Sequence, residues 1–187
     1  MINDDYRPRP GDFFLAQSNG AKWWAYGLLQ LLTGEPSQYT HAGIVLDDDT
    51  YIEARPGGAC IKQLDTLWER RALAFSQNYL TDAQRAEIVK VSRLQVGRPY
   101  SWDQFWVLAG RRMHVKTGKL EQRVERTQGM ICSQFVDYIY ERANVELFAD
   151  GRRPGDVSPG SLAHVGLLYH CRRQGILLPE PPQAAEA

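Results

Sequence analysis

Residues 129–140 read G-M-I-C-S-Q-F-V-D-Y-I-Y and place a cysteine at the start of an expected helix. Apolar residues recur at helical spacing (131, 135, 136, 139 and 140), which puts Ser133, Gln134 and Asp137 on the opposite face. Gly129 allows a tight turn before them. A thiol in a first helical turn faces unpaired N–H groups and the positive end of the helix dipole, which favour the thiolate. The stretch predicts a nucleophile at Cys132; a small buried apolar residue is the alternative.

Length and composition indicate one domain. The chain has 187 residues, of which 43% are hydrophobic and 24% charged, enough for a proper core without disulfide or metal support. We assign residues 1–178 to a single domain. Residues 179–187 carry three prolines with alanines and are expected to be a disordered tail.

Charge and cysteine usage exclude several classes. Lys plus Arg and Asp plus Glu are 22 each, so no net field favours nucleic acid. The three cysteines are widely spaced without a C-x-x-C pair, which argues for reduced thiols rather than a disulfide framework or zinc knuckle. No signal peptide or membrane span is recognisable, so we expect a protein that is cytoplasmic at synthesis and not integral to a membrane, with phage or virion association open.

Residues 39–54, Y-T-H-A-G-I-V-L-D-D-D-T-Y-I-E-A, predict a β-hairpin. If the three aspartates form the loop, Gly43 faces Glu53, and His41 shares their face of the hairpin. His41 and Glu53 are then diagonal neighbours, roughly 7–8 Å apart at the backbone, so the carboxylate could reach the imidazole. Gly43 leaves room for another group. A two-residue turn would instead put Glu53 on the opposite face, and a solvent-facing Glu beside a strand His is the simpler alternative.

Further elements follow from turn signals and periodicity. Strands are expected at 13–16, 59–64 and 73–75, helices at 21–32, 81–95 and 103–113, and a short capped helical turn at 158–162. The helix at 21–32 is rich in Trp and Leu, so it is either buried or lines an apolar groove. Cys60 is expected in the core. The charged stretch 111–126 is expected to be an exposed connection, either a lid or a simple loop.

Four motifs of the sequence resemble those of a known protein family. They are T-H-A-G-I-V-L (40–46), Y-I-E-A (51–54), G-R-P-Y-S-W (97–102) and I-C-S-Q-F-V (131–136). Together they resemble the circularly permuted papain-like group of YiiX/YaeF-type cysteine hydrolases and lecithin:retinol acyltransferase-like proteins, related to the NlpC-type cell-wall peptidases. The resemblance spans residues 11 to about 165. It implies an α+β fold in which a small antiparallel sheet or partial barrel packs against helices that include the nucleophile helix.

The resemblance also implies a site. Cys132 becomes the nucleophile, His41 the base and Glu53 the carboxylate that orients the imidazole. Tyr100 matches the family's tyrosine upstream of the nucleophile, as a substrate or oxyanion contact, and Ser133 is assigned to substrate binding. No metal or cofactor is expected. The charged insertion before Cys132 departs from the family pattern. The resemblance therefore indicates the type of reaction more directly than the substrate.

The expected reaction is cleavage of an amide through a thioester acyl-enzyme. Peptidoglycan-type peptides are ranked first as substrates, and a lipid amide or ester hydrolase or acyltransferase is the alternative. A hypothesis of another class is a non-catalytic binding module or phage structural module on the same scaffold. His164 as the base, and a metal site built from His41, Cys60 and His164, remain open without spacing support.

Overall fold

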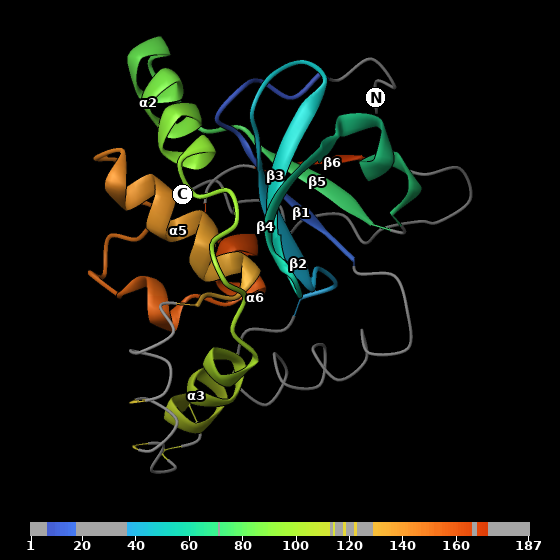
Figure 1. Cartoon of the computed structure of the whole chain (residues 1–187). Helices are drawn as coiled ribbons and strands as arrows, with labels where there is room; N and C mark the ends of the chain where they lie inside the picture. The colour runs from blue at the N-terminus through green and yellow to red at the C-terminus, as the bar shows by residue number, and fades with distance from the viewer. Residues whose placement is uncertain are drawn as a thin grey trace, which may run out of the picture.

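An antiparallel sheet forms the centre of the computed structural model, which describes residues 7–17, 37–70, 72–112, 114, 118, 122, 129–165 and 168–171 (Figure 1). Its strands are β1 (Phe13–Ala16), β2 (His41–Val45), β3 (Thr50–Arg55), β4 (Gly58–Gln63), β5 (Leu73–Ser76) and β6 (Leu168–Cys171). They lie in the order β4-β3-β2-β1-β5-β6, with every pair antiparallel. The expected α+β class is therefore confirmed.

Three α-helices, named below, cover one face of this sheet. The α-helices are α2 (Asp82–Arg93), α3 (Trp102–Arg112), α5 (Cys132–Arg142) and α6 (Pro159–Ala163), and the 3-10 helices are η1 (Leu64–Glu69) and η2 (Pro154–Asp156). Helices α2, α5 and α6 lie on the same side of the strands (Figure 1). The predicted capping box starts α2: the N–H of Gln84 donates to Thr81 Oγ1 over 3.2 Å, and Gln84 Oε1 accepts the N–H of Thr81 over 2.9 Å.

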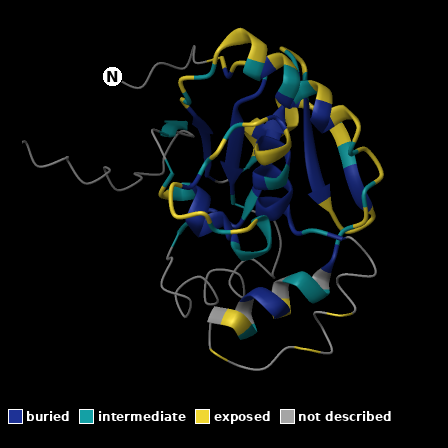
Figure 2. Ribbon diagram, turned by 90° about the vertical axis from the view of Figure 1, so that its left-hand side faces the viewer, coloured by how far each residue is buried: buried dark blue, intermediate teal, exposed yellow. Residues whose placement is uncertain are grey.

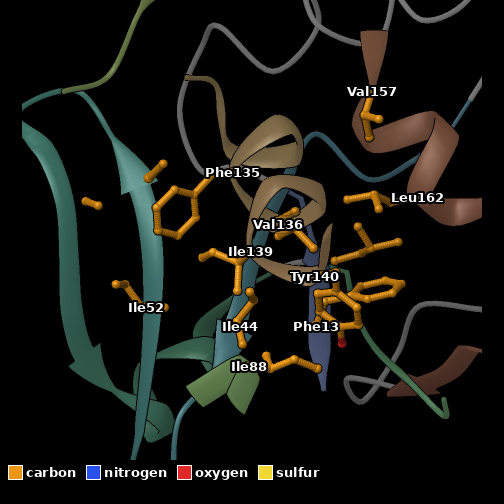
Figure 3. Close-up of a cluster of buried hydrophobic side chains, with 14 of the residues drawn as sticks. Phe13, Ile44, Ile52, Ile88, Phe135, Val136, Ile139, Tyr140, Val157 and Leu162 are labelled. Carbon is orange, nitrogen blue, oxygen red and sulfur yellow. The ribbon is translucent and has the colours of Figure 1, made fainter. Parts of the chain in front are cut away.

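The main core fills the space between the sheet and these helices (Figure 3). Its fully buried side chains come from alternate strand positions and from the apolar stripe of α5: Phe13, Ile44, Ile52, Phe135, Val136, Ile139 and Tyr140. Ile88 of α2 and Leu162 of α6 close it. Strands β1, β2, β3 and β5 and helices α5 and α6 are accordingly mostly buried, whereas β6 is only partly buried (Figure 2). Burying this apolar area fixes α5, and with it the position of Cys132.

A second apolar cluster lies on the other face of the sheet. Phe14 packs edge-on against Tyr51 and Phe75, and Leu64 and Leu67 of η1 cover them. Gly43 belongs to the same face. A Cβ at Gly43 would lie 2.6 Å from the Phe14 ring and 2.5 Å from the Ile52 carbonyl oxygen. The room that glycine was expected to leave is therefore occupied by an aromatic ring.

A buried ion pair joins the start of the chain to α2. Arg85 Nη1 donates to Asp12 Oδ1 and to the Pro10 carbonyl, each over 2.8 Å. Burial raises the pKa of Asp12, and the hydrogen bond from Arg85 opposes that rise. The hydroxyl of Tyr140, from α5, donates to the Gly11 carbonyl. These contacts hold β1, α2 and α5 together, although the buried Nε of Arg85 has no hydrogen-bond partner.

Some predicted elements differ from the structure. Strand β6 and helix η1 were not expected, and Cys60 is half-buried rather than a core residue. The expected helix at 21–32, the tail 179–187 and most of the charged stretch 111–126 lie outside the described residues. On the face of α5 opposite its apolar residues, Ser133, Gln134 and Asp137 are buried as well. The segment around η2 packs on that face, which sequence periodicity did not indicate.

Candidate active site

The hairpin of β2 and β3 brings His41 and Glu53 together. Gly43 pairs with Glu53 and Val45 with Tyr51, and the N–H of Leu46 donates to the Thr50 carbonyl over 2.9 Å. This is the register predicted for a loop of three aspartates. His41 and Glu53 consequently share a face, and Nε2 of His41 lies 2.6 Å from Oε2 of Glu53. The Glu53 side chain is only 2% exposed and that of His41 12%, so the pair is shielded from water.

Two further cations hold the Glu53 carboxylate. Lys62 Nζ lies 2.8 Å from Oε1, and Arg70 Nη2 lies 3.6 Å from Oε2. Burial alone raises the pKa of a carboxyl group, but the hydrogen bond and charge of His41, followed by those of Lys62, lower the pKa of Glu53 to about 2. Glu53 is therefore an ionised acceptor throughout the physiological range.

Cys132 reaches the same imidazole from the first turn of α5. Its side chain is buried, and α5 packs on β2 and β3, the strands that carry His41 and Glu53. Burial lowers the pKa of His41, but the charge of Cys132 and a hydrogen bond to it, together with Glu53, raise that pKa to about 9. Glu53 contacts Nε2 of His41 over 2.6 Å. His41 therefore interacts with both a carboxylate and the Cys132 thiol.

The segment before Cys132 fixes the start of α5. Met130 forms a parallel bridge with Tyr100, and the N–H of Met130 donates to the Pro99 carbonyl over 3.2 Å. A Cβ at Gly129 would lie 2.7 Å from Ser101 Cβ, so this close approach requires glycine. Gln134 Oε1 accepts the N–H of Ile131 over 3.3 Å. The following first-turn N–H groups have no partner inside the helix and can face an oxyanion.

The two predicted substrate-binding residues have different surroundings. Tyr100 is half-buried and packs with Leu108 and Ile131, directly beside the nucleophile. Ser133 is fully buried, and its hydroxyl donates to the Val157 carbonyl over 2.8 Å. This hydrogen bond ties α5 to the chain after η2, so Ser133 has a structural contact and its predicted role in substrate binding gains no support. Tyr100 packs beside Ile131, and its role as a substrate or oxyanion contact stays a prediction.

The alternative site residues lie elsewhere. His164 caps α6 and is exposed, and its Nδ1 lies 2.7 Å from the Gly160 carbonyl oxygen of the same helix. Cys60 faces Glu53 across the β3–β4 ladder. Within the described part of the chain, no three His, Cys, Asp or Glu side chains gather as a metal would require. The His41, Cys60 and His164 set is thus not assembled.

Sequence reasoning missed Lys62 and Arg70. Alternation along β4 could have placed Lys62 on the face of Glu53, because Tyr51 pairs with Lys62 and Glu53 with Cys60. Arg70 gave no such signal. It follows η1, whose buried Leu64 and Leu67 anchor it, and its N–H donates to the Leu67 carbonyl over 3.0 Å.

Fold and site together define an α+β protein in which the first turn of a helix meets a His–Glu pair on a β-hairpin. No family model and no curated protein sequence matches the chain. A solved structure described as metalloprotein yiiX from Escherichia coli O157:H7 is similar, with a TM-score of 0.61, 17% sequence identity, and coverage of 90% of this chain and 99% of that one. At this identity the likeness shows the fold alone, an α+β fold shared with a YiiX-type protein. The papain-like and permuted character that the four motifs indicated stays a prediction. In the described residues, no helix has the length and hydropathy to cross a membrane.

Proposed function

We propose that the chain is a cysteine hydrolase that cleaves amide bonds through a thioester, with Cys132, His41 and Glu53 as its catalytic triad. The observation that carries the proposal is the position of His41 between Cys132 and the buried carboxylate of Glu53. A cysteine, an imidazole and an orienting acceptor are the three parts of an activated thiol nucleophile. A merely structural histidine would not require an ionised, buried Glu beside it.

The reaction follows from these groups. The Cys132 thiolate attacks the carbonyl carbon, and the tetrahedral oxyanion forms against the N–H groups at the start of α5. His41 gives its Nδ1 proton to the leaving amine as the C–N bond breaks, which leaves a thioester. The now neutral His41 takes a proton from water, the resulting hydroxide attacks the thioester, and the acid departs while the thiolate and the imidazolium are restored.

Glu53 orients the imidazole during both steps. Its Oε2 accepts the Nε2 proton of His41, so Nδ1 points at the nucleophile. The negative charge of Glu53 also stabilises the imidazolium that acts as the acid. Because Glu53 takes the Nε2 position, the Nδ1 proton stays available to the leaving group.

For the substrate, we place peptide-type amides of the peptidoglycan kind first, on the strength of the motif resemblance to NlpC-type peptidases. A lipid amide or ester, hydrolysed or transferred to another acceptor, is the second candidate. One observation favours it: Leu108 of α3 packs on Ile131 beside the nucleophile, and Trp106 of the same helix is 59% exposed. An exposed indole on the helix that packs beside Ile131 suits an acyl chain.

Metal-dependent chemistry, which the name of the similar structure suggests, does not fit this site. A bound divalent cation would need the oxygens of Glu53, but Lys62 and Arg70 already place two positive charges beside them. No third metal-ligating side chain of the described residues joins His41 and Glu53 in a group that could hold an ion. The donor set therefore favours thiol chemistry.

The pH dependence of iodoacetamide labelling, followed by peptide mass spectrometry, tests the proposal without a known substrate. Cys132 should react well below the pH at which a free thiol does, and His41→Ala should abolish that advantage while His164→Ala retains it. Cys60 and Cys171 serve as internal controls. A panel of peptidoglycan fragments and lipid amides then identifies the substrate. Ordinary reactivity at Cys132, and no turnover that Cys132→Ala removes, would support the binding-module hypothesis instead.

A further inference from the structure

Glu53 has more positive neighbours than a His-orienting carboxylate requires. Its Oε2 lies 2.6 Å from His41 and 3.6 Å from Arg70, while Oε1 lies 2.8 Å from Lys62. The carboxylate is 2% exposed, whereas Lys62 and Arg70 are 30% and 17% exposed. The two cations therefore lie at the edge of the site, where they keep contact with water, and direct their charge at a group inside it.

The fold builds this arrangement from three elements. Lys62 belongs to β4, whose register with β3 makes it a diagonal neighbour of Glu53 on the same face. Arg70 directly follows η1, which Leu67 anchors in the second apolar cluster. Besides these groups and His41 of β2, the Cys60 thiol faces Glu53 directly across the ladder.

A buried glutamate next to a histidine poses a proton-sharing problem. At 2.6 Å, the proton between Oε2 and Nε2 can stay on the imidazole or move to the carboxylate, which would give two neutral groups. Burial favours the neutral pair. A fixed ammonium on the other carboxylate oxygen favours the ionised form, because the neutral form would leave the ammonium without its counter-charge.

We propose that Lys62, assisted by Arg70, is a positioning residue that keeps Glu53 ionised and thereby keeps the Nε2 proton on His41. The inference rests on the proposed role of His41 as the partner of Cys132. Lys62 acts through Glu53 and touches no reacting atom. It provides the positive charge that makes a fully buried carboxylate usable as the orienting group.

The direction in which removal of the Lys62 charge shifts Cys132 reactivity along the pH scale distinguishes this role from simple repulsion between Lys62 and His41. If Lys62 acted only on His41, removing its charge would stabilise the imidazolium, and the acid limb of Cys132 reactivity would move to lower pH. If Lys62 acts through Glu53, its removal lets Glu53 take up a proton at higher pH. The imidazolium then loses its partner, and the acid limb moves to higher pH.

The experiment follows the Glu53 side-chain carboxyl carbon by NMR titration of the whole chain, with the resonance assigned by Glu53→Gln. In Lys62→Met the midpoint should rise by about one pH unit or more, and Lys62→Arg should largely restore it. Lys90→Met, which removes an exposed lysine paired with Glu87 on α2, should leave the midpoint unchanged. Arg70→Met should give a smaller rise than Lys62→Met, in keeping with its longer contact.

Cys132 labelling completes the test. Lys62→Met should move the acid limb to higher pH in the wild-type background and should not do so in the Glu53→Gln background. An unmoved carboxyl titration, or an acid limb that moves to lower pH, overturns the inference. Ordinary Cys132 reactivity in the wild type, combined with a Glu53 titration that still depends on Lys62, would instead overturn the proposed function and leave the Lys62–Glu53 coupling standing.

Discussion

Nε2 of His41 and Oε2 of Glu53 are 2.6 Å apart on neighbouring strands, and the carboxylate is almost completely buried. Glu53→Gln keeps the shape of the side chain but removes its charge. We expect the pKa of His41, now about 9, to fall by about 1–3 units, because an adjacent carboxylate stabilises the imidazolium by that amount. NMR titration of the His41 ring protons measures the change.

Glu87→Gln is the matched control for that substitution, because Glu87 is a partly exposed residue of α2 that pairs with Lys90 instead of His41. It should leave the titration of His41 unaltered. If Glu53→Gln shifts the His41 pKa no more than Glu87→Gln does, the carboxylate is not the partner that sets it.

A second prediction concerns the alkaline limb of activity. Cys132 and Glu53 raise the pKa of His41 to about 9. His41 therefore remains an imidazolium below that pH and can protonate the leaving group. We expect kcat/KM for amide cleavage to fall above about pH 9. The free imidazole titrates near 6.5, so the stability linked to His41 protonation is complete below pH 6.5 and is lost as the pH rises through 9.

Cys132→Ser separates the two contributions to the raised pKa of His41. A serine hydroxyl stays neutral, so the pKa of His41 should fall while Glu53 still raises it. The chemical-denaturation midpoints of wild type and Cys132→Ser, compared between pH 6 and pH 10, report the stability term. If the two proteins show the same change of midpoint between pH 6 and pH 10, Cys132 does not contribute to the raised pKa of His41.

Local patterns predicted the parts of the site that depend on one or two elements. Helical spacing placed Cys132 in a first turn, and the three-aspartate loop gave the register that joins His41 to Glu53. The burial of Ser133 was not predictable, because it depends on the chain after η2, more than twenty residues away. Arg70 was missed for the same reason: its position is set by the packing of η1, which has no periodic signal.

Gly43 gives a third prediction. A Cβ at this position would lie 2.5 Å from the Ile52 carbonyl and 2.6 Å from the Phe14 ring, both fully buried neighbours. Gly43→Ala should therefore destabilise the protein by about 1–3 kcal/mol or more, and it should disturb the strand pair that carries His41 and Glu53. Thermal unfolding measures the cost. Gly57→Ala, where a Cβ meets no atom within 4 Å but φ is +102°, controls for backbone strain alone.

A fourth prediction concerns the Arg85–Asp12 ion pair. Both side chains are at least nine-tenths buried, and their contact is 2.8 Å. Arg85→Met leaves Asp12 charged and without its partner, so we expect a loss of about 3–5 kcal/mol. The double variant Asp12→Asn/Arg85→Met should lose less than the sum of the two single variants in urea unfolding, because it removes both charges. Additive losses would show that the two residues are not coupled.

Asp137 gives the last prediction, and it is a stabilising one. This carboxyl lies on α5, five residues after the nucleophile, and is 4% exposed. Burial, followed by the charges of Glu146 and Glu141, raises its pKa to about 7 from an ordinary value of 3.8. Its ionisation therefore costs nothing at pH 4, costs progressively more as the pH rises toward 7, and reaches its full cost above pH 7.

Asp137→Asn should consequently raise the unfolding temperature at pH 8 and change it little at pH 4. We expect a gain on the order of 1 kcal/mol or more at pH 8, since each pKa unit corresponds to about 1.4 kcal/mol. Asp150→Asn is the matched control: Asp150 is exposed, and hydrogen bonds from Arg152 lower its pKa, so its neutralisation should bring no gain at either pH. An equal gain from Asp137→Asn at both pH values would mean that packing of the amide, rather than relief of a buried charge, stabilises the helix that carries Cys132.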